Sequence, residues 1–177
     1  RGCVDIKNQR HKEATIFFNG GANMHEPEWN EFQSHFEMED LPTTWGGYDK
    51  LPLRAKYFSR FNKDYLGMTG KFHTMWGEFG GFKNPQALKF ECASMLMYGA
   101  GCSVGDQAHP SGCMDLETYR IIGEAYEYVR QIEDYSYHIT ETAKLGVMLN
   151  REGKGKDAYE FDSSYEGVIK ILLEKQL

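Results

Sequence analysis

The sequence predicts an α/β protein with a parallel sheet: the C-terminal half of a (β/α)8 TIM barrel, followed by the first β-α unit of a flavodoxin-like domain. Strand-like runs occur at residues 14–19, 33–39, 64–69 and 102–106, and each precedes a loop and a helical pattern. Because parallel strands require helical crossovers, this rhythm favours four parallel strands in sequence order. Their spacing fits half of a barrel in which eight strands occupy ~250 residues. A doubly wound sheet fits the spacing as well, so the rhythm alone leaves both folds open.

Three helices are expected to cover this sheet. The first spans about residues 49–61, and the third spans residues 116–132 after the cap residue Asp115. The second begins at Asn84 and Pro85, a cap and a first-turn residue that favour a helix start, and it ends near Gly99. Apolar residues at helical spacing predict the buried faces: Leu88, Cys92, Met95 and Leu96 in the second helix, and Tyr119, Ile122, Tyr126 and Val129 in the third.

Residues 140–177 differ in character from residues 1–139, and we predict a domain boundary between them. The run at 142–149 is typical of a strand, and a polar loop follows it. Ser163 and Glu166 then form a capping box that opens a final helix. One strand and one helix cannot make a domain, so we interpret this tail as the start of a flavodoxin-like domain. The absence of an initiator Met leads us to expect a piece of a longer protein.

Composition argues against several classes of function. The formal net charge of −6 is unlike the basic surfaces that bind nucleic acid or anionic lipid, so neither partner is expected. No run approaches the roughly 20 apolar residues that span a bilayer. The four cysteines show neither a CxxC pair nor metal-ligand spacing. A disulfide framework is therefore not expected; localisation stays unknown, although this cysteine usage favours a reducing, cytoplasmic compartment.

Aromatic residues gather with glycines and acids in three segments. These are TTWGGYDK at 43–50, KFHTMWGEFGGF at 71–82 and GDQAHPSG at 105–112, in a chain that is 14% aromatic and contains 19 glycines. Such glycine density is typical of loops. Each segment follows a predicted strand, at the end of a parallel sheet where loops carry binding and catalytic side chains. We therefore expect a ligand site in these loops.

The stretch from His35 to Glu133 resembles a group of hypothetical glycosyl hydrolases related to α-L-fucosidases. The motifs that carry the resemblance are HFEMEDLPTTWGGYDKLPLRAKY, LGMTGKFHTMWGEFGGFKNPQALKFECASMLMYGAG and CSVGDQAHPSGCMDLETYRIIGEAYEYVRQIE. Members of this group have a TIM barrel followed by a β-galactosidase-type trimerisation domain. The resemblance implies that the four predicted strands are strands five to eight of the barrel and that the tail begins the trimerisation domain. It also implies that the nucleophilic Asp, which ends the fourth strand in related retaining fucosidases, precedes Arg1.

Glu39 and Glu78 are the candidate catalytic residues of such a hydrolase. Glycosidases place two carboxyl groups about the scissile bond, and the general acid among them has a raised pKa. Glu37 and Glu39 share a parity on one strand, so we expect both to point inward rather than against an apolar helix layer; a solvated acid at the strand's end is the alternative for Glu39. Glu78 lies among aromatic residues, a setting that raises a carboxyl pKa. Alternatively, Glu78 accepts hydrogen bonds from backbone amides in a glycine-rich turn.

The other candidate residues are expected to bind a carbohydrate. The flat surfaces of Trp45, Tyr48 and Trp76 suit stacking on a sugar ring. Polar side chains near the ends of the predicted strands could hold its hydroxyl groups: Glu37, His73, Asp106, Gln107 and His109. For His73 a structural role is the alternative, and for Asp106 the alternative is capping of its own loop.

Two other functions stay open. His35, His73 and His109 lie on or just after predicted strands, and imidazoles with a carboxylate such as Asp106 can bind zinc and activate water in a metal-dependent barrel hydrolase. No H-x-H pair is present, and we predict neither a metal nor a cofactor. The aromatic loops would also suit a non-catalytic carbohydrate-binding or assembly fragment. Because half a barrel leaves unpaired strand edges, we expect a homo-oligomer or a complementing chain that supplies the first half.

Overall fold

A three-stranded parallel sheet forms the centre of the protein. The computed structural model describes residues 2–20, 22, 24, 27–45, 47–136, 139, 144–148 and 163–177. Within them the strands are β1 (Phe36–Glu39), β2 (Tyr65–Gly70) and β3 (Gly101–Gly105), in the order β1-β2-β3, and both neighbouring pairs are parallel. Three of the four predicted strands are therefore confirmed, with their order and direction.

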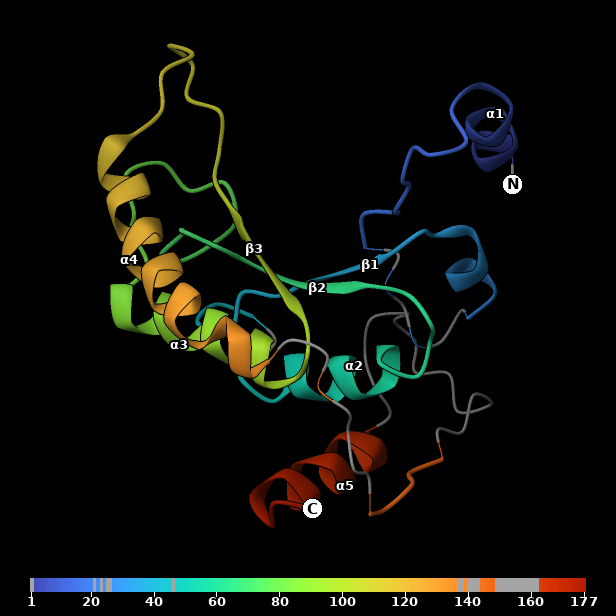
Figure 1. Cartoon of the computed structure of the whole chain (residues 1–177). Coiled ribbons are helices and arrows are strands. Elements are labelled where there is room, and N and C mark those ends of the chain that lie inside the picture. The colour runs from blue at the N-terminus through green and yellow to red at the C-terminus, as the bar shows by residue number, and fades with distance from the viewer. Residues whose placement is uncertain are drawn as a thin grey trace.

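The helices that follow the strands lie together on one face of the sheet (Figure 1). They are α2 (Lys50–Phe58), α3 (Pro85–Met97) and α4 (Leu116–Ile132), which follow β1, β2 and β3 in turn. Helices α1 (Gly2–Arg10) and α5 (Ser163–Glu174) lie near the two ends of the chain, and short 3-10 helices span Pro27–Phe32 and Glu133–Tyr135. No helix in the described part of the chain is long and apolar enough to cross a membrane.

The ends of α3 and α4 follow the local signals in the sequence. The side chain of Asn84 accepts a hydrogen bond from the Gln86 N–H at 2.9 Å, and that of Asp115 accepts one from the Glu117 N–H at 3.0 Å. These caps satisfy amide groups that a helix start leaves without a partner. Gly99, at φ 74°, follows the end of α3 in a left-handed conformation that suits glycine. Helix α2 is shorter than expected, because the chain turns at residues 59–61.

Two clusters of buried apolar side chains join the helices to the sheet. One lies between β1 and α2 and includes Phe36, Met38 and Phe58; the other joins α3 and α4. The predicted stripe on α3 is buried. On α4 the prediction is confirmed only at Val129; the other buried positions, Thr118, Ile121 and Ala125, each lie one residue before a predicted one. Small residues at 118 and 125 allow close helix packing, and Tyr119 and Tyr126 stay 40% and 38% exposed.

Residues 14–19, predicted as the first strand, do not form a strand. They lie beside the start of β1, where the Ser34 N–H donates to the Ile16 carbonyl oxygen at 2.8 Å. The other bonds use side chains: the Ile16 N–H donates to Ser34 Oγ at 2.7 Å and the Phe18 N–H donates to Gln33 Oε1 at 3.0 Å. A strand requires repeated backbone pairing, and these side chains take its place.

The predicted strand at 142–149 is also wrong over its described part, because residues 144–148 form no strand. Leu145 and Met148 are 56% and 94% exposed, so this alternating run has no sheet to pack against. Residues 142, 143, 149 and the polar loop after them lie outside the described residues. The final helix is confirmed as α5, and its buried Ile169 belongs to the same apolar cluster as Phe58 of α2. The domain boundary at 139/140 stays a prediction.

Candidate functional site

The two faces of the sheet differ because side chains alternate along each strand. On β1, Phe36 and Met38 are fully buried in the cluster with α2; on β3, Cys102 and Val104 pack toward α3 and α4. On β2, Thr69 bonds to a residue of α3. The residues that alternate with these along each strand project from the opposite face, which we call the front face. They are Glu37, Glu39, Met68, Gly70, Ser103 and Gly105. The expectation that both glutamates point away from the helices is confirmed.

Trp76 lies across the carboxyl ends of β2 and β3 on this front face. A Cβ atom added to Gly105 would lie 2.3 Å from Cη2 of the indole, and one added to Gly70 would lie 3.1 Å from its Cζ3. The ring therefore packs directly against two glycines that are paired across the strands. Phe72 supports it at a centroid distance of 5.0 Å. Trp76 stays 39% exposed, so it offers a flat surface at the strand ends.

Glu39 ends β1 on the same face and is half-buried. Its Cα partner on β2 is Met68, two residues before Gly70. Nη1 of Arg54, on α2, donates to the Glu39 carbonyl oxygen at 2.8 Å, and Nη2 of Arg54 donates to the Ala22 carbonyl at 3.0 Å. The backbone of Glu39 is thus held from the helix side of the sheet. Its carboxylate has no hydrogen bond to the residues described, which leaves it able to bind a ligand.

Glu78 does not have the environment that the sequence predicted. Its Oε2 accepts hydrogen bonds from the backbone N–H groups of His73 at 3.1 Å and Thr74 at 2.7 Å. These bonds, above all the one from Thr74, lower the pKa of Glu78, whereas an apolar pocket would have raised it. The carboxylate also lies against Gly81, where an added Cβ would come within 2.6 Å of it. Glu78 matches the alternative interpretation, a carboxylate that holds its own loop together.

The loops after β2 and β3 meet above the sheet. The rings of Phe79 and His109 lie 6.0 Å apart in an edge-to-face arrangement. His109 and His73 are both exposed, and Nδ1 of His109 lies 2.9 Å from Ser111 Oγ. Asp106 accepts a hydrogen bond from the Gln107 N–H at 2.7 Å, as the loop-capping alternative expects. Oε1 of Gln107 is buried without a hydrogen-bond partner among the described residues.

The two aromatic residues of the loop after β1 lie away from Trp76. Tyr48 reaches the helix side of the sheet, where its hydroxyl lies 3.4 Å from Glu91 Oε1 of α3 and its ring meets Phe90 at 5.4 Å. Burial raises the pKa of Tyr48. Trp45 pairs with Leu41 in an antiparallel bridge, and Nζ of Lys50 lies 4.6 Å from its ring centroid. Of the three proposed stacking residues, only Trp76 lies over the front-face strand ends.

The three candidate histidines form no metal site within the described residues. His35 lies just before β1, with Nδ1 3.2 Å from Ser34 Oγ and Nε2 3.1 Å from Glu37 Oε1. The carboxylate of Glu37 thus contacts the His35 ring near the amino end of β1. Among the residues that the structure describes, no three His, Cys, Asp or Glu side chains are grouped so that they could hold a metal ion.

A buried polar network behind the strand ends was not predicted. Lys83 Nζ lies 2.6 Å from Glu91 Oε2, and Thr69 Oγ1 donates to the same oxygen at 2.6 Å. Asp40 lies nearby at 3% exposure, and its carboxyl oxygens have no partner among the described residues. Burial raises the pKa of Asp40 to about 7. The sequence did carry a signal: Glu91 falls within the apolar stripe of α3, and a charge at a buried helix position requires a partner.

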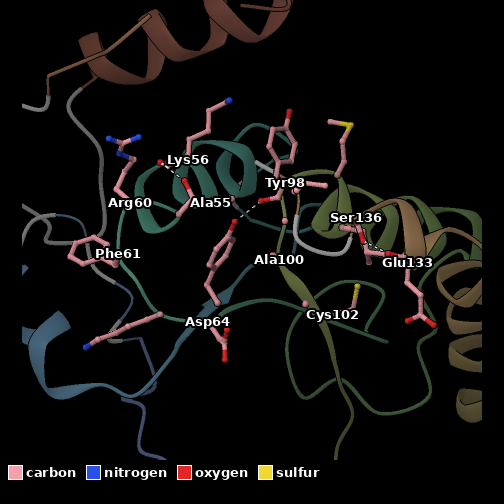
Figure 2. Close-up of a pocket in the computed structure, with 18 of the residues that line it drawn as sticks. Ala55, Lys56, Arg60, Phe61, Asp64, Tyr98, Ala100, Cys102, Glu133 and Ser136 are labelled. Carbon is pink, nitrogen blue, oxygen red and sulfur yellow. Dashed lines mark hydrogen bonds between the residues drawn. The ribbon is translucent and has the colours of Figure 1, made fainter. Parts of the chain in front are cut away.

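A large pocket lies at the opposite ends of the strands. Its volume is about 1310 Å³, and Figure 2 shows Lys56, Arg60, Asp64, Tyr98 and Glu133 around it. Its lining includes Tyr65 and Gly101, the first residues of β2 and β3. It therefore opens at the amino ends of the strands and contains none of the candidate residues. Catalytic and binding loops of parallel α/β enzymes follow the carboxyl ends, so we place the candidate site at Glu39 and Trp76.

The sheet, the helix layer on one side and the loops at the strand ends are those of a parallel α/β fold, and the chain is homologous to part of a glycoside hydrolase. That hydrolase is α-L-fucosidase isoenzyme 2 from Paenibacillus thiaminolyticus, whose structure matches with a TM-score of 0.85 and 38% sequence identity. The match covers 96% of this chain and 26% of the fucosidase chain, so the chain spans about a quarter of that protein. No family model and no curated protein matches the chain.

Proposed function

We propose that this chain forms part of the active site of a glycoside hydrolase that acts on α-L-fucosides. The observation that carries the proposal is the placement of Glu39 and Trp76 on one face of the sheet, at the carboxyl ends of its strands. The likeness to part of an α-L-fucosidase supports the choice of substrate. The carboxylate and the aromatic surface are the two components that sugar hydrolysis requires from such a site.

Glu39 acts as a catalytic carboxyl group in this proposal. Cleavage of a glycosidic bond requires a proton on the leaving oxygen and a carboxylate that stabilises the oxocarbenium-like centre. Trp76 stacks on the sugar ring, while His73, Asp106, Gln107 and His109 contact its hydroxyl groups. In this proposal the second carboxylate of the pair lies outside the described residues, because Oε2 of Glu78 accepts hydrogen bonds from the amides of His73 and Thr74 and is engaged within its own loop.

The architecture belongs to the same proposal. The three strands are members of the second half of a TIM barrel, and the front face of the sheet is its interior. The remaining strands close the barrel, either from the same natural polypeptide or from a second chain. The segment from residue 140 begins a further domain. Light scattering of the natural polypeptide tests whether it assembles into an oligomer.

Replacement of Glu39 by Gln in the natural polypeptide tests the function. With an alkyl α-L-fucoside as substrate, whose leaving oxygen needs a proton, we expect kcat/KM to fall by about 10²–10⁴-fold, the usual contribution of a general acid or base. Circular dichroism and thermal unfolding should stay unchanged. If Glu39 is the acid, the loss should be smallest for substrates with good leaving groups, because those need no proton.

The exposed Glu124 of α4 supplies the matched control, and Glu124→Gln should keep full activity. Near-native activity of Glu39→Gln on natural fucosides would remove Glu39 from the mechanism. If the wild-type polypeptide binds L-fucose in calorimetry but cleaves no fucoside, the chain instead belongs to a non-catalytic carbohydrate-binding protein.

A further inference from the structure

The loop that carries Trp76 leaves the sheet and returns to it at almost the same point. At its base the Lys83 N–H donates to the Lys71 carbonyl at 2.6 Å, and the Lys71 N–H donates to the Gly105 carbonyl at 3.0 Å. Nζ of Lys71 also reaches the Gly81 carbonyl at 3.3 Å. The residues between, 72–82, form the whole arm around Trp76, so the position of this arm depends on how its two ends are held.

The returning end is held by charges behind the sheet. The side chains of Lys83 and Glu91 are 1% and 2% exposed, and their charged atoms lie 2.6 Å apart. Lys83 Nζ also donates to Thr69 Oγ1 at 2.8 Å. Thr69 belongs to β2, and Lys83 directly precedes the cap of α3. The network thus fixes the end of the loop to a strand and a helix at once.

Glu91 contacts the neighbouring loop as well. Its Oε1 lies 3.4 Å from the hydroxyl of Tyr48, in the loop after β1, while its Oε2 accepts from Lys83 and Thr69. One carboxylate on α3 therefore joins the loops that follow β1 and β2. These loops connect to the two strands that carry Glu39 and support Trp76.

Stability alone is a poor explanation for such a pair. A buried ion pair loses the hydration of both charges, and its replacement by apolar residues of similar volume is often neutral or stabilising. Displacement of Lys83 would leave Glu91 buried and unpaired, which is strongly unfavourable. Any other position of Lys83, at the end of the loop, therefore costs free energy, whether or not the pair adds to the stability of the fold.

We propose that the buried pair Lys83–Glu91 positions the loop of residues 72–82, so that Trp76 is held against Gly70 and Gly105 at the strand ends. Lys83 and Glu91 are positioning residues that act from behind the sheet and contact no substrate. The consequence for sugar binding rests on the proposed function, whereas the positioning of residues 72–82 by the pair does not depend on that function.

The apolar double variant Lys83→Met with Glu91→Leu, made in the natural polypeptide, separates position from stability. We expect its melting temperature to stay close to that of the wild type, while either single replacement lowers it. Hydrogen–deuterium exchange of the amides between residues 71 and 83 should rise by about tenfold, which equals about 1.4 kcal/mol of lost local stability. The matched control is Arg130→Met with Glu127→Leu, an exposed pair on α4, which should leave this exchange unchanged.

The exchange measurement decides the proposal without any reference to activity. Wild-type exchange in a folded double variant would overturn it. If the double variant does not fold, the proposal is tested on Glu91→Gln, which keeps the shape and removes one charge and should raise exchange in the same segment. Where the wild type cleaves fucosides, kcat/KM of the double variant should fall by up to about 10²-fold, the effect of a misplacement near 1 Å, with an unchanged pH profile. A wild type without fucosidase activity would contradict the proposed function alone.

Discussion

The indole ring of Trp76 rests on the backbone of Gly105, so closely that a Cβ atom at this position would come within 2.3 Å of Cη2. The glycine is therefore a component of the candidate site, although it carries no functional group. Its contact places the ring over the paired ends of β2 and β3, on the face from which Glu39 projects.

Gly105→Ala should displace Trp76 and lower activity without unfolding the protein. Gly105 has no positive φ, so alanine strains no backbone, and the rigid ring must move instead. We expect kcat/KM on an aryl fucoside to fall by up to about 10²-fold. Gly123→Ala is the control, because an added Cβ there meets nothing within 4 Å; in a helix this change should stabilise by about 0.5–1 kcal/mol. Equal activity of the Gly105 variant and the wild type would mean that the position of the ring is unimportant.

Glu78→Gln should cost far less activity than Glu39→Gln. Amides of His73 and Thr74 lower the pKa of Glu78, so its carboxyl group is ionised at neutral pH and is a poor proton donor. Its stabilising contacts exist above its ordinary pKa and are lost as the pH falls through the lowered value. We therefore expect faster amide exchange at residues 73 and 74 in the variant, with a small change in kcat. A loss of about 10²–10⁴-fold would instead identify Glu78 as the acid.

Asp40→Asn should alter the dependence of stability on pH. Burial, opposed by Lys50 and Arg54, raises the pKa of Asp40 from 3.8 to about 7. Between these values the folded protein holds a proton that the unfolded chain has lost, so this group makes stability fall as pH rises, by up to about 1.4 kcal/mol per pH unit. Urea unfolding from pH 4 to 8 should show that the free energy of unfolding of the variant rises relative to that of the wild type up to about pH 7. Above this pH the difference between the two should stay constant. Asp134→Asn, on the surface, should show no such gain.

Arg54→Leu should destabilise the protein by about 3 kcal/mol, because it leaves the carbonyl groups of Ala22 and Glu39 without their donor in a buried setting. Urea unfolding measures the loss. Arg130→Leu, which removes an exposed arginine of α4, is the control and should have little effect. A variant as stable as the wild type would show that water replaces Arg54 at both carbonyl groups.

Features with local causes could be predicted from the sequence. The start of α3 at Asn84 and Pro85 and that of α4 after Asp115 depend on side chains within two residues of the amides they bond. The order and direction of β1, β2 and β3 follow from their alternation with helices. The parity of Glu37 and Glu39 placed both on one face, and the apolar residues that alternate with them, Phe36 and Met38, indicated which face that was.

Features that depend on distant partners could not be predicted in the same way. Residues 14–19 have the composition of a strand, yet the segment beside them bonds to them mainly through Ser34 and Gln33 side chains. Glu78 has aromatic neighbours in the sequence, but in space its carboxylate meets amide groups, and so its pKa falls rather than rises.

Short-range hydrogen bonding and side-chain periodicity define the β-α succession, the helix caps and the loops in which a site should lie, so these features can be predicted from the amino-acid sequence. The contact of Trp76 with Gly70 and Gly105, the turn of Tyr48 to the helix side and the pairing of Lys83 with Glu91 are evident only in the folded protein. Packing contacts and buried charge pairs join residues from different elements. Their energies depend on distance and burial, and both are defined only when the chain has folded.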